Sequence, residues 1–383
     1  MIKSVRRILP RLEDYDGWLL LSVLVLCSLG TVMVLSAGSF RFQGPPGQIN
    51  HYYYLGKHLA RLALGIIGML VLANLDYRFL RKPLFNWGLI AAGLAFIGLP
   101  LILNDGDFRR WTNIGLFPIQ PLELTKLAVV LFLAGRLVSL DRKQTDYRRQ
   151  LGITLLIPML AVAILILQPN YGNALVISLL TLALLFITGI SNRLLVAALV
   201  PVTVAVGLGY LFEPKISNRV QAWWSGLEGE GLCYQVEQSL IGIGAGGLLG
   251  SGVGASHQRF WFLPESHTDF IFAVLGEELG LLGTLGALAM FALFAYRGYT
   301  IARRARDPFG QVVATGLTTL IFLYVITNLA MVVGLFPVIG VPLPFVSYGG
   351  SALVTNLAAV GILLSIDRQG RAHQVWRARL ARV

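Results

Sequence analysis

The side chains best suited to acid–base chemistry gather just before a long apolar segment. Glu265, His267 and Asp269 lie within five residues of one another, and the apolar run begins at Phe270. A carboxylate can accept the proton that an alcohol loses as it attacks an electrophile, so Asp269 is a candidate general base. Asp and Thr are also favoured N-caps, and an acid suits the positive end of a helix dipole. The local pattern leaves both roles open for Asp269, because Thr268 could provide the cap instead.

Four further ionisable side chains lie inside apolar segments, where a charge is costly and is a candidate for function. Glu123 and Lys126 are i, i+3 neighbours on a predicted helix, so they can neutralise one another. This spacing does not separate a structural ion pair from a functional one. Glu277 and Glu278 follow Asp269 along the next helix. Glu277 is eight residues beyond Asp269, about 12 Å deeper, and we predict a buried structural contact for it.

These residues must be positioned by membrane-spanning helices, because the chain is too apolar for a soluble protein. Its 383 residues are 56% hydrophobic and 13% charged, whereas soluble domains are about 25% charged. A bilayer core of about 30 Å needs about 20 helical residues. The sequence therefore predicts an all-α polytopic membrane protein, a single transmembrane domain of ten helices. The predicted spans lie near 18–36, 58–74, 84–103, 121–138, 151–167, 171–188, 194–212, 270–295, 311–335 and 346–366.

Lys and Arg residues determine the predicted orientation. With the N-terminus in the cytoplasm, the cytoplasmic segments hold 22 of the 31 basic residues, in agreement with the positive-inside rule. Topology thus explains the net charge of +12 better than nucleic-acid binding does. An even number of spans places both termini in the cytoplasm. The longest connection, 213–269, becomes a large outer loop between spans seven and eight, and Asp269 ends it at the outer face of the membrane.

A set of cations on the outer side departs from this rule. Arg binds phosphate through paired hydrogen bonds, and Lys supplies a compact charge. Taken singly, each of these side chains could be a solvated or snorkelling residue. As a set they indicate an anionic ligand at the outer surface, most simply a lipid pyrophosphate. The cations are Arg109, Arg110, Lys126, Lys215, Arg219 and Arg259.

The sequence contains no strong metal or nucleotide motif. His257, His267 and Asp269 match no zinc spacing, so we predict no metal site and no certain cofactor. The sequence leaves open whether a divalent cation bridges Asp269 and a pyrophosphate. The glycine-rich run 242–254 follows no predicted strand and lacks the Lys-Ser/Thr of a phosphate loop, which favours flexible packing.

Four motifs follow one another along the chain: residues 110–123, the run 252–259 leading into Leu263-Pro264-Glu265, residues 267–272, and residues 342–351. Together they give the chain a resemblance to the SEDS family (shape, elongation, division and sporulation) over about residues 15–368. The run in the second motif is closer to the FtsW branch of the family, and the turn 337–342 before the fourth is closer to RodA. We favour FtsW.

The resemblance implies a peptidoglycan glycosyltransferase that polymerises lipid II at the outer face of the bacterial inner membrane, for division or elongation. It places the essential Asp of the family on Asp269, and His267, Gln168 and Ser347 join the predicted substrate-binding residues. The implied partners are a class B penicillin-binding protein and other division or elongation membrane proteins, with no nucleic acid. An FtsW-like role would locate the chain at the septum.

Three residues depart from the family pattern, and two other functions stay open. Asn170 and Asn173 stand where the family turn usually has Asp and Thr, and Leu122 replaces the usual Ser before Glu123. A lipid II flippase would need polar groups through the whole membrane depth, whereas here they concentrate in the outer half. A non-catalytic scaffold for a penicillin-binding protein would tolerate the two Asn residues.

Overall fold

The computed structural model of the chain describes residues 15–38, 52–103, 112–114, 117–140, 145–190, 195–196, 203, 207, 210–211, 214–228, 233–258, 262–264 and 266–380. Within these residues the chain is helical apart from one short antiparallel hairpin, in which Thr112 pairs with Ile119. This hairpin qualifies the all-α prediction. The elements in order are α1 (Gly17–Gly38), α2 (Tyr53–Asn74), the 3-10 helix η2 (Tyr77–Arg81), α3 (Pro83–Leu103), β1 (Thr112–Ile114), β2 (Phe117–Ile119), α4 (Pro121–Ser139), α5 (Tyr147–Leu167), α6 (Tyr171–Ile187), α8 (Pro214–Leu227), α9 (Tyr234–Ala245), α11 (Ile271–Arg304), α12 (Pro308–Val332) and α13 (Gly350–Leu380).

The predicted spans coincide with described helices, except that the segment 194–212 lies largely outside the described residues. Seven of these helices are long and apolar enough to cross a membrane, namely α1, α2, α3, α5, α11, α12 and α13. Two others fall short of that standard. α4 carries Glu123, Lys126 and Arg136, and α6 has only 17 residues. The chain is therefore a multi-span helical protein, and the count of ten stays a prediction.

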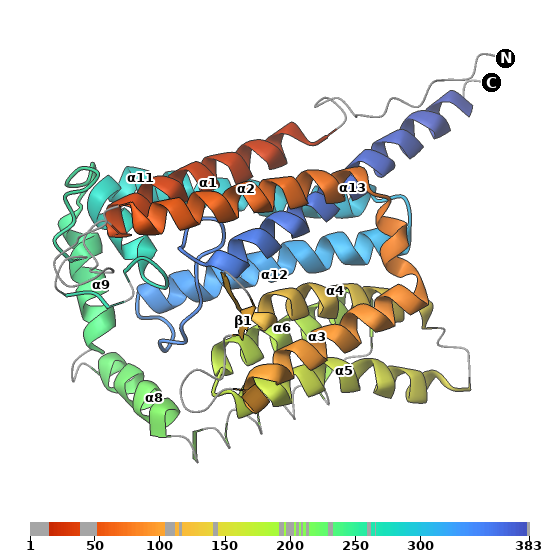
Figure 1. Ribbon diagram of the computed structural model, residues 1–383, viewed down its shortest axis with the longest axis horizontal. Helices are drawn as coiled ribbons and strands as arrows, with labels where there is room; N and C mark the ends of the chain where they lie inside the picture. The colour runs from red at the N-terminus through yellow and green to blue at the C-terminus, as the bar shows by residue number, and fades with distance from the viewer. Residues whose placement is uncertain are drawn as a thin grey trace.

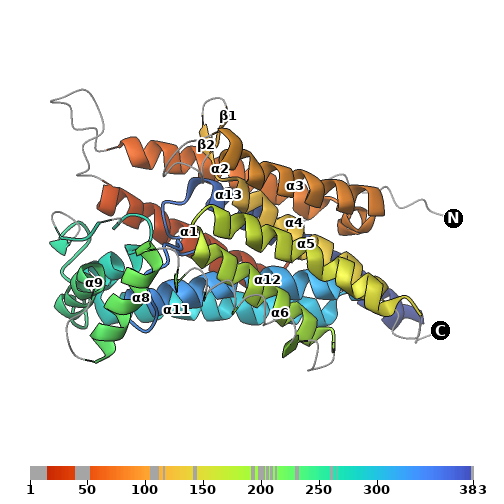
Figure 2. The same ribbon diagram turned by 90° about the horizontal axis from the view of Figure 1, so that it is seen from below.

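The helices form a bundle with α12 and α13 at its centre (Figure 1). The spanning part of α12 is 78% buried, whereas that of α2 is only 17% buried and leaves one apolar side for lipid. α13 packs along α2 and also contacts α11 and α12. The start of α1 and the end of α13 lie at the same end of the bundle, and α8 and α9 lie at the other end (Figures 1 and 2).

The connection predicted as an outer loop at 213–269 is partly helical. α8 and α9 lie across the ends of the long helices, and α9 packs against α11 and α12. The Ser239 hydroxyl donates to the Val332 carbonyl at 2.8 Å. The Trp223 indole N–H donates to the Gly334 carbonyl at 3.1 Å. These bonds attach both helices to the end of α12, so this part of the connection is a folded cap.

The helical backbone of α11 is interrupted at Gly280, and the glycine-rich run forms hydrogen bonds with the backbone around this interruption. Gly280 has φ 65° and ψ −162°, which interrupts the helical hydrogen bonds. The Ser251 and Gly252 amides donate to the carbonyls of Glu277 and Glu278 at 2.9 and 3.0 Å. The Leu281 amide donates to the Gly247 carbonyl at 2.9 Å. Residues 246–252 thus satisfy backbone groups on both sides of the break, which is a more definite role than flexible packing.

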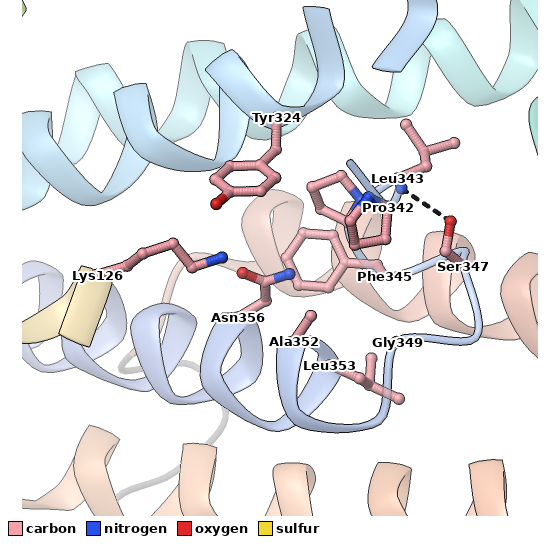
Figure 3. Close-up of a pocket in the computed structure, with 11 residues that line it drawn as sticks. Lys126, Tyr324, Pro342, Leu343, Phe345, Ser347, Gly349, Ala352, Leu353 and Asn356 are labelled. Atoms are coloured by element: carbon pink, nitrogen blue, oxygen red, sulfur yellow. Dashed lines mark hydrogen bonds between the residues drawn. The ribbon is translucent and has the colours of Figure 1, made fainter. Parts of the chain in front are cut away.

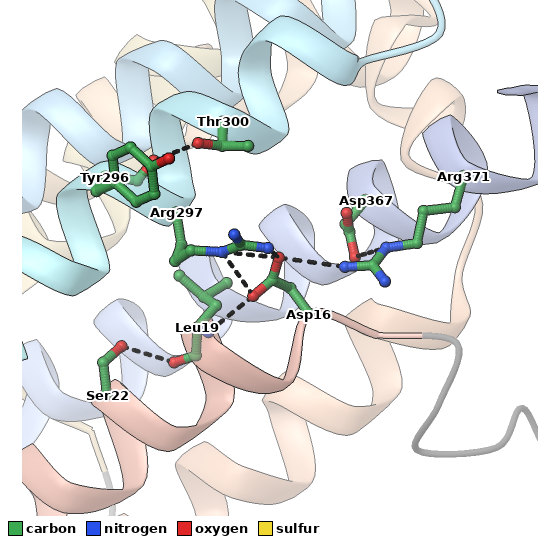
Figure 4. A network of polar contacts seen from close by, with 8 residues as sticks. All are labelled: Asp16, Leu19, Ser22, Tyr296, Arg297, Thr300, Asp367 and Arg371. Carbon is green, nitrogen blue, oxygen red and sulfur yellow. Dashed lines mark hydrogen bonds and ion pairs between the residues drawn. The ribbon is translucent and has the colours of Figure 1, made fainter.

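A charged network closes the opposite end of the bundle (Figure 4). Asp16 is 1% exposed and accepts a hydrogen bond from the Leu19 amide at 2.9 Å, which caps α1. Arg297 of α11 and Arg371 of α13 both pair with its carboxylate. Burial acts to raise the pKa of Asp16, but the hydrogen bonds from Arg297 and Leu19 and the two Arg charges outweigh it and hold the pKa below its usual value. The network joins three helices at one level.

Candidate active site

Asp269 lines a cavity at the end of the bundle that carries α9. The cavity has a volume of about 200 Å³, which is room for several water molecules at about 30 Å³ each. The start of α4, the start of α6, the loop before α11 and the segment before α13 form its walls. The lining residues are Gln120, Glu123, Asn170, Asn173, Thr268, Asp269, Gly340, Pro342, Tyr348, Gly349, Gly350, Ser351 and Ala352. Two carboxylates and three side-chain amides therefore line one space.

The backbone of Asp269 is held by a buried amide of α12. The Asn328 Nδ2 donates to the carbonyls of Asp269 and Val341, each at 2.7 Å. Gly340 has φ 68°, and a Cβ there would lie 3.3 Å from the Asp269 Oδ2, so glycine leaves room for the carboxylate. Phe270 occupies the N-cap position of α11 and makes no side-chain cap. Asp269 therefore stands before the cap rather than in it.

Ser347 and His267 join the loop before α11 to the segment before α13. The Ser347 hydroxyl donates to the Thr268 carbonyl at 2.6 Å and accepts from the Leu343 amide at 2.8 Å. The Tyr348 amide donates to the His267 carbonyl at 3.0 Å. The His267 ring is buried, with centroids 5.1 Å from Tyr54 and 5.7 Å from Tyr348. We predicted substrate contacts for Ser347 and His267; neither is among the described residues that line this cavity, and the substrate contact stays a prediction for both.

The predicted ion pair of Glu123 and Lys126 is present. The Lys126 Nζ lies 2.7 Å from the Glu123 Oε2, and the two residues are 3% and 2% exposed. Glu123 lines the cavity, whereas Lys126 lines a separate small pocket with Tyr324, where its Nζ lies 3.9 Å from the centroid of the Tyr324 ring (Figure 3). Lys126 is thus neutralised by its neighbour and is not a cation of the cavity that holds Asp269.

The two Asn residues that depart from the family pattern continue this polar chain. The Tyr324 hydroxyl donates to the Asn173 Oδ1, and the Asn173 Nδ2 donates to the Asn170 Oδ1 at 2.8 Å. Both Asn residues are buried and line the cavity. Neutral amides at 170 and 173 therefore line the same cavity as Asp269 and add no charge to it.

The other predicted substrate-binding residues do not line this cavity in the described part of the chain. Gln168 is buried, and its Nε2 donates to the Ile97 carbonyl at 2.5 Å, which attaches the end of α5 to α3. Arg219 is exposed on α8 and lines a separate cavity of about 20 Å³ with Trp223. The remaining predicted cations lie outside the residues whose side chains are described: Arg109, Arg110, Lys215 and Arg259.

Glu277 makes the buried structural contact that we predicted. Its carboxylate accepts hydrogen bonds from the Ser256 hydroxyl, the His257 amide at 2.7 Å and the Gln258 amide at 3.3 Å. No group of three His, Cys, Asp or Glu side chains suited to a metal is found among the described residues.

Comparison with known proteins identifies the family. Residues 17–372 match the family model FTSW_RODA_SPOVE, which is described as "Cell cycle protein". This chain belongs to the FTSW_RODA_SPOVE family. Stage V sporulation protein E of Bacillus subtilis (strain 168) is 35% identical over 370 residues, covering 93% of this chain and 98% of that protein. The "Probable peptidoglycan glycosyltransferase FtsW" of Trichlorobacter lovleyi is 36% identical over 373 residues, covering 93% and 94% of the two chains. These relatives confirm the resemblance to the SEDS family.

Solved structures of FTSW_RODA_SPOVE relatives share the fold. A chain described under "Structural coordination of polymerization and crosslinking by a peptidoglycan synthase complex" superposes with a TM-score of 0.73 and is 26% identical, covering 93% of this chain and 98% of that one. The rod shape determining protein RodA of Thermus thermophilus has a TM-score of 0.67 and 27% identity, covering 94% of this chain and 99% of that one.

The sequence analysis did not predict three residues that line or brace the cavity of Asp269. Asn328 and Tyr324 lie one turn apart on α12, where both side chains are buried, and Tyr348 lines the cavity. A signal existed for the first two, because polar side chains inside an apolar span are costly without a partner. We weighed only ionisable residues within the spans and so passed over an amide and a phenol.

Proposed function

We propose that this chain is a peptidoglycan glycosyltransferase that polymerises lipid II into glycan strands at the outer face of the bacterial inner membrane. The observation that carries the proposal is the carboxylate of Asp269 at the wall of a polar cavity, in a chain whose relatives are described as probable peptidoglycan glycosyltransferases. Among the described residues, the acidic side chains that line this cavity are Asp269 and Glu123, and Glu123 is paired with Lys126. We therefore assign the base to Asp269.

In the proposed reaction Asp269 takes the proton of the acceptor sugar hydroxyl. The hydroxyl oxygen forms a bond to the anomeric carbon of the donor, and the bond from that carbon to the lipid pyrophosphate breaks, with inversion. The leaving pyrophosphate carries away the electron pair and needs positive charge nearby. Arg109, Arg110, Lys215 and Arg259 stay candidates for that charge, and a divalent cation, if one were held near Asp269, would supply charge of the same kind.

The partner, location and topology belong to the same proposal. We expect a class B penicillin-binding protein as partner, with support from the similarity to a chain of a peptidoglycan synthase complex. We expect ten spans with both termini in the cytoplasm, and the ion pair of Asp16, just before α1, with Arg371 of α13 supports two termini on one side of the membrane. Other division or elongation membrane proteins, and the septum as the location, follow from an FtsW-like role.

Polymerisation of lipid II by the purified protein with its partner tests the reaction. We expect Asp269→Asn to reduce glycan-chain formation by at least about 100-fold, in the range lost when acid–base catalysis is removed. Glu237→Gln, which changes an exposed carboxylate on α9, is the matched control and should polymerise normally. Glycan chains of normal length and yield from Asp269→Asn would refute the assignment.

The two alternative functions give different results in the same preparations. A flippase would move labelled lipid II across vesicles while making no polymer. A non-catalytic scaffold would bind the penicillin-binding protein and leave both polymerisation and lipid movement at background. Polymer that depends on Asp269 agrees with neither alternative.

A further inference from the structure

Two cations lie one turn apart on α2, near the end of the bundle that carries the cavity of Asp269. Lys57 and Arg61 fall within the first three turns of that helix. Like charges at i, i+4 repel one another, and a cation within a membrane span is costly. Among the described residues, no carboxylate forms an ion pair with either side chain. Two uncompensated charges at this depth need an explanation.

Aromatic rings rather than acids support these two cations. The Arg61 guanidinium carbon lies 5.2 Å from the centroid of the Tyr348 ring. The Lys57 Nζ lies 4.0 Å from the centroid of the Tyr53 ring and donates to its hydroxyl. A ring face attracts a cation without neutralising it. Both positive charges therefore stay available to an anion.

Arg61 lies directly against the wall of the cavity. Tyr348, Gly349 and Gly350 all line the cavity that holds Asp269. Any side chain at position 350 would overlap the Arg61 guanidinium, so glycine there lets the guanidinium approach the backbone of the wall. Arg61 is partly exposed, which leaves its remaining N–H groups accessible. Its planar fork can bind two oxygens of a phosphate at once.

We infer that Arg61 binds the diphosphate of the lipid-linked sugar donor, with Lys57 as a second cation one turn nearer the start of α2. This inference rests on the proposed function and names the residue that receives the leaving group. Arg61 places a positive charge beside the cavity. Lys126 cannot take this role, because Glu123 neutralises it. The same two cations could instead hold the phosphate of an ordinary anionic phospholipid, and the experiment separates these sources.

The test measures steady-state polymerisation in nanodiscs of phosphatidylcholine, with the penicillin-binding partner present. We expect Arg61→Gln to raise the KM for lipid II by about 10- to 100-fold, the loss typical of a hydrogen bond to a charged group. Inhibition by undecaprenyl diphosphate should weaken by a similar factor. Arg61→Lys should recover part of both effects, and the thermal midpoint should stay unchanged. Arg81→Gln, an exposed arginine of η2 at the other end of the bundle, should behave as wild type.

Two outcomes would overturn the inference while leaving the polymerase intact. One is an unchanged KM and unchanged inhibition in Arg61→Gln. The other is a polymerisation rate that responds to added phosphatidylglycerol in wild type but not in Arg61→Gln, while undecaprenyl diphosphate inhibits both proteins equally. That result would assign the two cations to a phospholipid. If wild type makes no polymer, the proposed function fails by itself. Direct binding of undecaprenyl diphosphate then decides about Arg61: weaker binding by Arg61→Gln supports the inference, and equal binding overturns it.

Discussion

The side chain of Asn328 holds the backbone of Asp269, because its Nδ2 lies 2.7 Å from the Asp269 carbonyl oxygen. The same amide lies 2.7 Å from the Val341 carbonyl oxygen. One buried residue of α12 therefore fixes the distance between the loop that carries the base and the loop that faces it. These bonds join the Asn328 side chain to backbone carbonyls and leave the Asp269 carboxylate untouched, so Asn328 is a positioning residue for Asp269.

Asn328→Leu should lower kcat for polymerisation by about tenfold or more while the KM for lipid II changes little. The substitution leaves two buried carbonyls without their donor, at about 1–3 kcal/mol each, and allows the Asp269 loop to shift. Thr327→Val is the matched control, since the Thr327 hydroxyl bonds only to carbonyls of its own helix. A wild-type kcat in a folded Asn328→Leu protein would contradict the positioning role.

The Glu123–Lys126 pair should behave as a buried unit in thermal unfolding. Lys126→Met leaves the Glu123 carboxylate buried and unpaired, which typically costs about 3–5 kcal/mol. The double variant Glu123→Gln/Lys126→Met removes both charges and should recover most of that loss. Unfolding in detergent, followed for the two single variants and the double variant, gives the coupling between the two sites. A double variant as unstable as the sum of the singles would show that the two charges do not act together.

The sequence was informative wherever the relevant spacing is local. Apolar length located the spans, and the i, i+3 spacing located the Glu123–Lys126 pair. Contacts between distant segments carry no such period. The bond from Asn328 to the Asp269 loop joins residues 59 apart, and nothing in the local pattern of α12 indicates its target. The family resemblance identified Asp269, but only the packing of α2 against the segment before α13 placed Arg61 beside the same cavity.

Gly250→Ala should destabilise the break in α11. Gly250 has φ 81°, and a Cβ there would overlap the Glu278 carbonyl, so both the backbone angle and the space require glycine. We expect a loss of about 1–3 kcal/mol, as for other residues forced into this conformation. Gly244→Ala in α9 is the control, because a Cβ at that helical position meets nothing within 4 Å. Equal thermal midpoints for the two variants would show that the turn 246–252 does not stabilise the break.

Asp16 should make stability depend on pH in the acid range. Burial opposes its ionisation, but the contacts with Arg297, Leu19 and Arg371 prevail, and the pKa of the folded protein lies below the ordinary 3.8. Ionised Asp16 therefore contributes stability that is fully present above pH 3.8 and is lost as the pH falls through the folded-state pKa. Asp16→Asn should lower the thermal midpoint near neutral pH, and its difference from wild type should shrink once the pH falls below 3.8. Carboxylates remote from this network titrate in both proteins and cancel in that difference, whereas Asp367, which also pairs with Arg371, is coupled to Asp16 and contributes to it. A gap that stays constant down to the acid end of the series would show that the charge on Asp16 does not hold α1, α11 and α13 together.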